Sequence, residues 1–523
     1  MPRANDLALT WPRVCALALG ILAALGFEPL GLWPLTLMAL TGLLALLRQA
    51  SHRKAAFQLG WLFGWGLFAV SLNWLPTAFT YQAEMPAWLG WIAELALSGI
   101  LALFPALAVV AAWSARRRPA ALVLALAGCW TITEWLRGWT FTGLPWNPLG
   151  AVLVGPFDQV GAARLLPWLG TYALSGLAVL FAGLWFLGLS QFRRSRYWLV
   201  MLAVPLVAQF WPQTQSDEGF APLGVPYVLV QPNIPQAELN DPAHFEKNFE
   251  RLARYVPPPL AGRSAVVLWP ESGLSDYLRD GYPQQFYDET YGADPARARA
   301  RIAQMLGPDR LLLSGAVDLE MRDGRVVGAR NAITAVDGSG QIRVGYAKSH
   351  LVPFGEYVPL RPLLSALGIA RFVPGNVEFW PGPGRQTIDL GRFGKAGMLI
   401  CYEVIFAGEV TEPGNRPDYL FNPSNDGWYG AWGPPQHLAQ ARMRAIEEGL
   451  PLLRSTTTGI SAVIDADGRV LQAVPLNTAG VLLGRVPAAH PPTLFSKAGN
   501  LLSLGWAIAL LALSLVALRA RPE

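Results

Sequence analysis

Long apolar runs constrain this chain more than any other feature. A helix that crosses about 30 Å of hydrocarbon needs roughly 17 to 25 apolar residues. Eight candidate spans occur, at residues 10 to 27, 30 to 47, 55 to 75, 87 to 113, 119 to 136, 165 to 191, 196 to 212 and 495 to 518. The sequence therefore predicts an α-helical membrane bundle of eight spans.

The rest of the chain has the composition of a water-soluble domain. Overall, 52% of the residues are hydrophobic and only 15% are charged, which is too apolar for an ordinary soluble protein. We expect a bundle of seven spans over 1 to 212, a polar domain over 213 to 494, and a last helix with a short tail over 495 to 523. The first run is expected to stay in place, because Phe27-Glu28-Pro29 offers no small-residue cleavage site.

Cations mark alternate loops between the spans. They are Arg48, Arg53 and Lys54; Arg116, Arg117 and Arg118; Arg193, Arg194 and Arg196; and Arg519 and Arg521. Because loops rich in Lys and Arg stay in the cytoplasm, the amino terminus is predicted inside and the polar domain outside, on the periplasmic face in a bacterium. Much of the net charge of +5 lies in these loops. A nucleic-acid partner is therefore not expected.

The polar domain alternates short strand-like runs with helical stretches. Helices are expected near 243 to 255, 295 to 306 and 434 to 448. The expected strands are 227 to 231, 265 to 269, 311 to 317, 332 to 336, 397 to 401, 419 to 422, 451 to 454 and 461 to 464. Apolar strands separated by helices indicate sheets covered by helices, an α/β or α+β layered domain.

Three segments of this domain each present one reactive side chain. Glu271 lies in Trp-Pro-Glu-Ser directly after an expected strand, Lys348 lies in Ala-Lys-Ser-His, and Cys401 closes another strand. In isolation each has a bland explanation: a turn carboxylate, a solvated lysine and a small buried hydrophobe. Together they suit acyl transfer through a thioester, in which a thiolate attacks, a carboxylate moves protons and a cation stabilises negative charge. Glu356 and Glu403 are candidates for holding Lys348 or orienting an incoming amine.

Neither a metal nor a cofactor is expected. The five histidines, at 52, 244, 350, 437 and 490, form no pair or cluster at ligand spacing. No phosphate-binding glycine loop appears. Cys401 is the only cysteine of the polar domain, so no disulfide framework is available there.

The outer end of the fifth span is rich in tryptophan. Arg137 follows Glu134 there, and either interfacial anchoring or contact with a lipid headgroup explains the pair. Arg137, Trp146 and Trp428 are the candidates for substrate contact.

At these residues the sequence closely resembles the apolipoprotein N-acyltransferases, bacterial inner-membrane members of the nitrilase (carbon-nitrogen hydrolase) superfamily. The resemblance covers nearly the whole chain, and its segments are Trp269-Pro270-Glu271-Ser272, Lys348 to Glu356, Cys401-Tyr402-Glu403 and Ser424 to Trp428. It implies a four-layer αββα domain with Glu271 as general base, Lys348 as oxyanion stabiliser and Cys401 as nucleophile. By the same matching, Glu356 and Glu403 are essential carboxylates, Tyr402 is a site residue, and Trp428 lies on a mobile loop near the entrance.

The resemblance also implies the substrates. An acyl chain passes from a phospholipid, typically phosphatidylethanolamine, to the α-amino group of the S-diacylglyceryl cysteine of an apolipoprotein, and we expect a monomer. One departure is Leu239-Asn240, where the family often has Lys-Trp after Ile-Pro-Gln; the role of that tryptophan is not transferred to Asn240. Loops 353 to 359 and 424 to 433 are candidate lids.

Two alternative functions fit the same sequence: the first uses the three reactive residues, and the second uses none of them. A membrane-tethered amidase or nitrilase would pass the acyl group to water with the same Glu271, Lys348 and Cys401. A lipid-binding scaffold or transporter would carry a catalytically dead outer domain. The scarcity of ionisable residues in the spans argues against transport.

Overall fold

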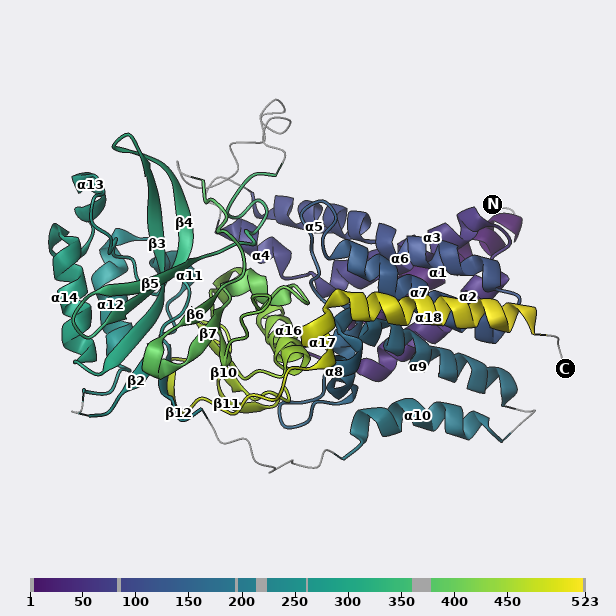
Figure 1. Cartoon of the computed structure of the whole chain (residues 1–523). Helices are drawn as coiled ribbons and strands as arrows, with labels where there is room; N and C mark the ends of the chain where they lie inside the picture. Colours follow the sequence, from purple (N-terminus) through teal and green to yellow (C-terminus); the bar gives the residue numbers. More distant parts are fainter. Residues whose placement is uncertain are drawn as a thin grey trace.

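The chain divides into a helical bundle and a pair of β-sheets, with the start of α1 and the end of α18 at the bundle end remote from the sheets (Figure 1). The computed structural model describes residues 4–81, 86–192, 196–212, 223–259, 262–359 and 378–520. Of the predicted cytoplasmic cations, Arg193, Arg194 and Arg521 lie outside these ranges.

Every predicted span overlaps a helix, but within the described residues four helices are both long and apolar enough to cross a membrane. These are Trp88–Ala115, Pro119–Arg137, Thr171–Gln191 and Asn500–Arg519. The first comprises α5 and α6, and the others are α7, α9 and α18. The remaining predicted spans coincide with α1, α2, α3 and α10, and crossing by these four stays a prediction. The bundle helices are α1 Ala4–Ala24, α2 Trp33–Gln49, α3 Arg53–Ser71, α4 Leu75–Thr80, α5 Ala87–Leu101, α6 Leu103–Ala112, α7 Pro119–Arg137, α8 Leu166–Leu169, α9 Thr171–Gln191, α10 Trp198–Phe210, α17 Leu494–Ala498 and α18 Asn500–Arg519.

Glycines let the bundle helices approach closely. A side chain at Gly60 of α3 would lie 2.8 Å from the Cα of Ala106 on α6, and one at Gly128 of α7 would lie 2.9 Å from the carbonyl oxygen of Ala507 on α18. Small residues at such contacts are typical of helices in lipid, where packing replaces the hydrophobic effect between helices.

The outer domain contains two six-stranded sheets. Their strand orders are β12-β1-β2-β3-β4-β5 and β11-β10-β9-β8-β7-β6. All eight predicted strands are present, as β1 to β4 and β7 to β10. The strands are β1 Pro226–Gln231, β2 Ala265–Leu268, β3 Arg310–Arg322, β4 Arg325–Asp337, β5 Ile342–Ala347, β6 Thr387–Asp389, β7 Lys395–Met398, β8 Tyr419–Ser424, β9 Leu452–Thr456, β10 Ser461–Ile464, β11 Val470–Val474 and β12 Gly480–Arg485.

Helices cover both outer faces of the sheet pair, which gives the layer order α, β, β, α (Figure 1). Helices α12 Phe245–Ala253 and α14 Pro295–Leu306 pack on the first sheet. The inner faces of the two sheets share one apolar core, and α16 Gly433–Glu448 covers the second sheet. The α/β sheet domain of the prediction is thus confirmed.

Helix α16 also joins the outer domain to the bundle. It is rich in charge yet buried along almost its whole length, because one side faces the second sheet and the other faces the bundle. The Arg442 guanidinium donates to the carbonyl oxygens of Gly155 at 2.6 Å and Pro156 at 2.8 Å. Glu447 accepts hydrogen bonds from the amide and hydroxyl of Thr171, both at 2.6 Å. These bonds attach α16, and with it the outer domain, to the bundle.

Candidate active site

Cys401 stands at a sharp turn between strand and helix. Two residues separate it from the end of β7, and it begins a 3₁₀ helix, Cys401–Ile405. Its φ is +49°, in the left-handed region that non-glycine residues rarely occupy and that is typical of functional turns. The side chain is buried, with Sγ 3.6 Å from the hydroxyl of Tyr429 and 4.0 Å from the carbonyl oxygen of Asn425.

Glu271, Asn331, Lys348 and Glu356 form one hydrogen-bonded set, which we call the site network. The Lys348 ammonium donates to Glu356 at 3.0 Å and to Glu271 at 3.5 Å. The Asn331 side-chain amide donates to the same two carboxylates, at 2.8 and 2.7 Å. The second oxygen of Glu271 accepts from the backbone amide of Asn425 at 2.8 Å. These hydrogen bonds hold both carboxylates and the ammonium in place relative to one another.

Electrostatics couple this network to the thiol. Burial raises the pKa of the Cys401 thiol, Glu271 raises it further, and Lys348 acts in the opposite direction, with a net pKa well above the ordinary value. Burial alone would lower the pKa of Lys348, but Glu356, Glu271 and Cys401 raise it above its usual range. The resting pair is therefore a protonated thiol beside an ammonium, and attack by sulfur requires a base to take the proton. Glu271 is the carboxylate that perturbs both groups.

Glu403 ties the lysine loop to the cysteine turn. One carboxylate oxygen accepts from the Tyr346 hydroxyl at 2.8 Å and from the amide and hydroxyl of Ser349, both at 2.7 Å. The other accepts from the amide of Ile400 at 2.7 Å. Glu403 thus positions the residues on either side of Lys348 and the residue before Cys401, and its hydrogen bonds go to these segments rather than to Lys348 itself.

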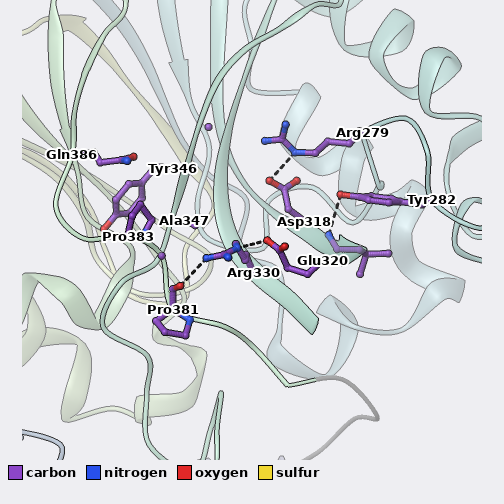
Figure 2. Close-up of a pocket in the computed structure, with 13 residues that line it drawn as sticks. Arg279, Tyr282, Asp318, Glu320, Arg330, Tyr346, Ala347, Pro381, Pro383 and Gln386 are labelled. Carbon is purple, nitrogen blue, oxygen red and sulfur yellow. Dashed lines mark hydrogen bonds and ion pairs between the residues drawn. The ribbon is translucent and has the colours of Figure 1, made fainter. Parts of the chain in front are cut away.

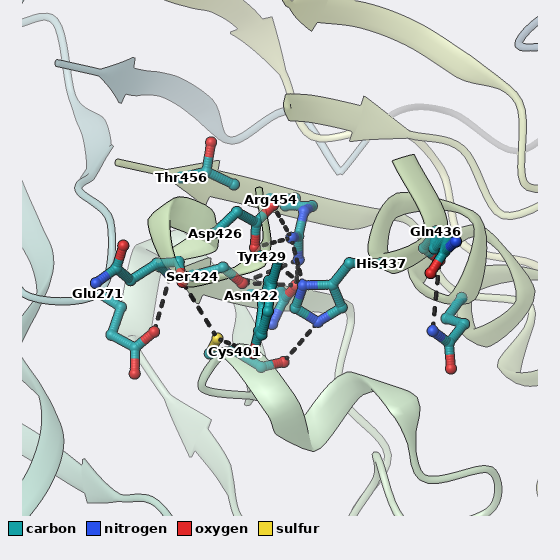
Figure 3. Close-up of polar contacts among 12 residues, drawn as sticks. Glu271, Cys401, Asn422, Ser424, Asp426, Tyr429, Gln436, His437, Arg454 and Thr456 are labelled. Atoms are coloured by element: carbon teal, nitrogen blue, oxygen red, sulfur yellow. Dashed lines mark hydrogen bonds and ion pairs between the residues drawn. The ribbon is translucent and has the colours of Figure 1, made fainter. Parts of the chain in front are cut away.

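A second buried cluster lies on the other side of Cys401 (Figure 3). We call Asp426, His437 and Arg454 the support cluster. An Arg454 nitrogen lies 2.8 Å from each oxygen of Asp426, and the Asp426 carboxylate lies 3.0 Å from Nδ1 of His437. Nε2 of His437 lies 3.2 Å from the backbone carbonyl oxygen of Cys401. The cluster thereby holds the backbone of the turn.

The support cluster has the residue types of a metal site but not its geometry. Cys401, Asp426 and His437 place ligand atoms within 4.8 Å of one another. However, the Arg454 guanidinium occupies both oxygens of Asp426, and the histidine nitrogen nearer Cys401 faces its carbonyl oxygen. Burial would raise the pKa of Asp426, but Arg454 and His437 hold it below its usual range. A cation would have to displace an arginine that already neutralises the site.

Comparison with known proteins identifies the family. The apolipoprotein N-acyltransferase N-terminal domain matches residues 19–184, and the carbon-nitrogen hydrolase family matches residues 229–490. The apolipoprotein N-acyltransferase of Rhodopseudomonas palustris is 36% identical over 99% of this chain and 97% of the relative. That of Bradyrhizobium diazoefficiens is 36% identical over 94% of this chain and 92% of the relative. The chain belongs to the apolipoprotein N-acyltransferase family.

The solved structures that match this chain include several that cover about half of it. An amidase from Nesterenkonia sp. covers 52% of this chain and 94% of its own length, with 16% identity and a TM-score of 0.32.

Tyr402 and Arg137 lie at the contact between the outer domain and the bundle. The Tyr402 hydroxyl donates to the carbonyl oxygen of Gly143 at 2.9 Å. The Arg137 guanidinium is buried and donates to the carbonyl oxygens of Leu144 and Trp146, both at 2.8 Å. Both side chains therefore bind the loop after α7, and substrate contact by Arg137 stays a prediction that these bonds do not favour.

An aromatic cluster connects the same loop to Cys401. Trp146 is buried, donates to the side chain of Gln436 at 2.8 Å, and packs against Trp74, Tyr429 and His437 with ring centroids 4.7 to 5.2 Å apart. Because Tyr429 also contacts the sulfur, the cluster forms the bundle side of the site in this acyltransferase family member.

Trp428 lies at the edge of this cluster. It is partly buried, and its ring meets that of Tyr81, which follows α4, at 5.6 Å. The predicted loop 424 to 433 therefore touches the bundle. Whether it and loop 353 to 359 act as lids stays a prediction.

One cavity lies apart from the reactive residues (Figure 2). It holds about 620 Å³ and is bordered by Asp318 and Glu320 of β3 and Arg330 of β4. Successive strand residues face opposite sides, so Arg330 points into this cavity while its neighbour Asn331 reaches Glu271 on the inner side. Arg279 pairs with Asp318 at 2.8 Å, and Arg330 pairs with Glu320, so the charges of these two pairs cancel.

Residue types alone did not reveal three contributors: Asn331, Tyr429 and Arg454. Asn331 begins the apolar part of β4, so a polar residue at the edge of a buried strand was an available signal. Arg454 lies in the buried strand β9, where an arginine requires a partner. Tyr429 carried no such signal, because an aromatic residue in a loop is ordinary.

Proposed function

We propose that this chain transfers an acyl chain from a membrane phospholipid to the α-amino group of the S-diacylglyceryl cysteine of an apolipoprotein, through a thioester on Cys401. The observation that carries the proposal is the buried Cys401 turn, coupled to Glu271 and Lys348 in a domain fixed on an apolar bundle. The near full-length match to apolipoprotein N-acyltransferases supports it.

In the first step, Glu271 takes the thiol proton as sulfur attacks the ester carbonyl carbon of the donor. A carbon–sulfur bond forms, the carbonyl oxygen becomes an oxyanion, and the ester carbon–oxygen bond then breaks. Glu271 returns the proton to the departing oxygen, so that a lysophospholipid leaves and a thioester remains.

In the second step, the apolipoprotein amine attacks the thioester carbonyl. Glu271 takes a proton from the nitrogen, the carbon–sulfur bond breaks, and the proton passes to sulfur. The product is an amide, and the enzyme regains its thiol. The amine must arrive uncharged, because only a nitrogen with a free electron pair attacks.

Lys348 stabilises the oxyanion in both steps, together with the backbone amide of Tyr402. A fixed cation at the place where charge develops lowers the barrier more than one that must reorganise. Glu356 holds the Lys348 ammonium in place by accepting its hydrogen bond, and Asn331 in turn donates to Glu356. Glu403 acts indirectly, by positioning the loops that carry Lys348 and Cys401.

The substrates explain the position of the site against the membrane bundle. Each CH₂ of an acyl chain costs about 0.8 kcal/mol to bring into water, so a chain of a dozen or more carbons must stay in lipid or in an apolar groove. A dry site also protects the thioester from hydrolysis. Trp428 and the aromatic cluster around Trp146 are our candidates for the wall along which the chain enters.

The proposed topology follows from the cations. Arg48, Arg53 and Arg519 lie in the end turns of α2, α3 and α18, and Arg116 follows the 3₁₀ turn after α6. The carboxyl end of α18 lies on the side of the bundle away from the sheets (Figure 1). We place that side in the cytoplasm and the catalytic domain in the periplasm of a bacterial inner membrane. The domain limits proposed are 1 to 212, 213 to 494 and 495 to 523, in a monomeric protein. Phosphatidylethanolamine is the proposed donor.

The amidase alternative is not favoured, because the family match includes the bundle domain as well as the hydrolase domain. A dead scaffold is not favoured either, since the reactive groups of all three types occupy one electrostatically coupled site.

Intact-mass spectrometry tests the proposal. Wild-type protein, Cys401→Ala and Cys401→Ser are each incubated with phosphatidylethanolamine, followed by a diacylated lipopeptide. We expect a fatty-acyl mass gain on the wild type, discharged by the lipopeptide into triacylated product, and no gain on the alanine variant. An adduct that water discharges as fast as the lipopeptide supports the amidase, and the absence of any adduct supports the scaffold.

A further inference from the structure

A smaller pocket lies where the bundle meets the segment that follows the Cys401 helix. It holds about 210 Å³ and is lined by Trp135, Trp139, Tyr172, Phe406, Glu409 and Asn500, among others. We call it the interfacial pocket. It is distinct from the site network and from the cavity of Figure 2, and it contributes no residue to the proposed chemistry.

The lining of the interfacial pocket suits an organic cation. Trp135, Trp139 and Phe406 supply aromatic rings, whose faces attract ammonium groups. Glu409 supplies a carboxylate, and the hydrogen bond with Nε2 of His350, 2.7 Å away, outweighs partial burial and lowers its pKa, so it is charged at neutral pH. The side-chain oxygen of Asn500 has no hydrogen-bond partner among the described residues and is a further acceptor.

The position of the pocket indicates which cation reaches it. Helix α7 ends at Arg137, while α9 begins at Thr171 and α18 begins at Asn500, so the pocket lies level with the outer ends of three apolar helices. Trp139, which lines the pocket, is 54% exposed, and Phe141, two residues further along the chain, is 93% exposed. Exposed aromatic residues at helix ends are typical of the headgroup level of a bilayer. The abundant cation at that level is the ammonium of a phospholipid headgroup.

The pocket is also connected to both catalytic segments. The His350 ring stacks on Phe406 at 4.2 Å with an interplanar angle of 14°, and His350 follows Lys348 by two residues. Phe406 directly follows the 3₁₀ helix that Cys401 begins, and its ring meets that of Tyr402 at 5.1 Å. An occupant that touches Phe406 and Glu409 therefore contacts the elements that carry the nucleophile and the oxyanion cation.

We propose that the interfacial pocket binds the ammonium headgroup of a phospholipid and makes the enzyme prefer ammonium-bearing donors over donors with an uncharged headgroup alcohol. The preference for a donor rests on the proposed function, whereas the binding of the headgroup does not. Glu409 is then a specificity residue that acts on the headgroup, and the catalytic residues remain those of the site network.

The first experiment measures binding without catalysis. Cys401→Ala protein in detergent is titrated with phosphatidylethanolamine or phosphatidylglycerol that carry the same acyl chains, and bound lipid is counted by native mass spectrometry. We expect tighter binding of phosphatidylethanolamine. Adding Glu409→Gln should abolish the preference, a change of about tenfold, as expected for one hydrogen bond to a charged group. The control is Glu246→Gln on α12, a carboxylate paired with Arg301 far from the bundle. Equal binding of both lipids before and after Glu409→Gln overturns the proposal.

The second experiment measures the rate of thioester formation with the two donors. Glu409→Gln should raise KM for phosphatidylethanolamine about tenfold and leave phosphatidylglycerol unchanged. Trp139→Leu keeps the Glu409–His350 contact and should have a smaller effect of the same kind. An equal loss with both donors means that Glu409 only supports the fold near His350, and it overturns the proposed specificity. Headgroup-selective binding without any wild-type thioester refutes the proposed function while the pocket assignment stands.

Discussion

Two buried charged clusters flank Cys401, and they differ in how completely their charges are matched. In the site network one ammonium serves two carboxylates, at 3.0 Å for Glu356 and 3.5 Å for Glu271. In the support cluster one guanidinium meets one carboxylate at 2.8 Å through both oxygens, and also donates to Ser424 at 2.9 Å. The first cluster keeps an unmatched negative charge, while in the second cluster the charges of Arg454 and Asp426 cancel.

The difference separates chemistry from stability. Two carboxylates share one ammonium in the site network, so one of them is available as the general base that the reaction requires. A matched pair cannot release a charge without leaving its partner buried and alone, which costs several kcal/mol. We therefore expect substitutions in the site network to remove activity and substitutions in the support cluster to remove stability.

The largest effect is expected for Glu271→Gln. Loss of the base should slow thioester formation by about 10²- to 10⁴-fold. The remaining Lys348–Glu356 pair is balanced, and the lost hydrogen bond from Asn425 costs about 1 kcal/mol, so the thermal midpoint should fall by no more than about 4 °C. Rates of acyl-enzyme formation and thermal unfolding in detergent check both parts. A midpoint that collapses along with the rate would mean that the two clusters do not differ in this way.

The largest loss of stability is expected for Arg454→Leu. It leaves Asp426 buried without its cation and should lower the free energy of unfolding by about 3 to 5 kcal/mol. The double variant Arg454→Leu/Asp426→Asn removes both charges and should recover part of the loss. Thermal unfolding of the two variants in the same detergent measures the difference. If Arg454→Leu abolishes acylation at an unchanged midpoint, the support cluster takes part in the chemistry.

The sequence predicted the layers of the outer domain because its buried strands are continuous apolar runs. Strands β5, β6, β11 and β12 were not predicted, since they are short or largely exposed and lie at the edges of the two sheets. Among the spans, α10 has 13 residues and α2 has 17, so both helices are shorter than the predicted runs 196 to 212 and 30 to 47. Apolar residues continue past a helix end, and a run of them does not show where the helix stops.

For the site, sequence position and chemical type were sufficient to select Glu271, Lys348 and Cys401. They could not show which residues join them, because partners such as Asn331 and Tyr429 come from separate strands and loops, and only the packed sheets bring them together. Nor could they show that Arg137 is buried against the loop that follows α7, because an arginine at a helix end looks the same in sequence whether it faces lipid headgroups or backbone carbonyls.

A smaller effect is expected in the pH dependence of Cys401 alkylation. The negative charge of Glu271 raises the pKa of the thiol, and Lys348 lowers it. Glu271→Gln should therefore move the alkylation profile to lower pH and Lys348→Met should move it to higher pH, each by about one unit or more. Iodoacetamide labelling followed by peptide mass spectrometry isolates Cys401 from Cys15 and Cys129. An unchanged profile in both variants would show that burial alone sets the thiol pKa.

The smallest effect is expected for Tyr402→Phe. This variant tests whether the Tyr402 hydroxyl takes part in the chemistry or only attaches the outer domain to the bundle. The Tyr402 hydroxyl donates to Gly143 in the loop after α7, not to a residue of the site network. Its removal should cost about 1 kcal/mol of stability and change kcat/KM by no more than about fivefold, since the ring and its contact with Phe406 remain. Steady-state acylation and thermal unfolding measure the two quantities. A hundredfold loss of kcat/KM at an unchanged midpoint would instead place the hydroxyl on the substrate. Tyr402 would then act in the chemistry together with the site network, and its role would not be limited to attaching the outer domain to the bundle.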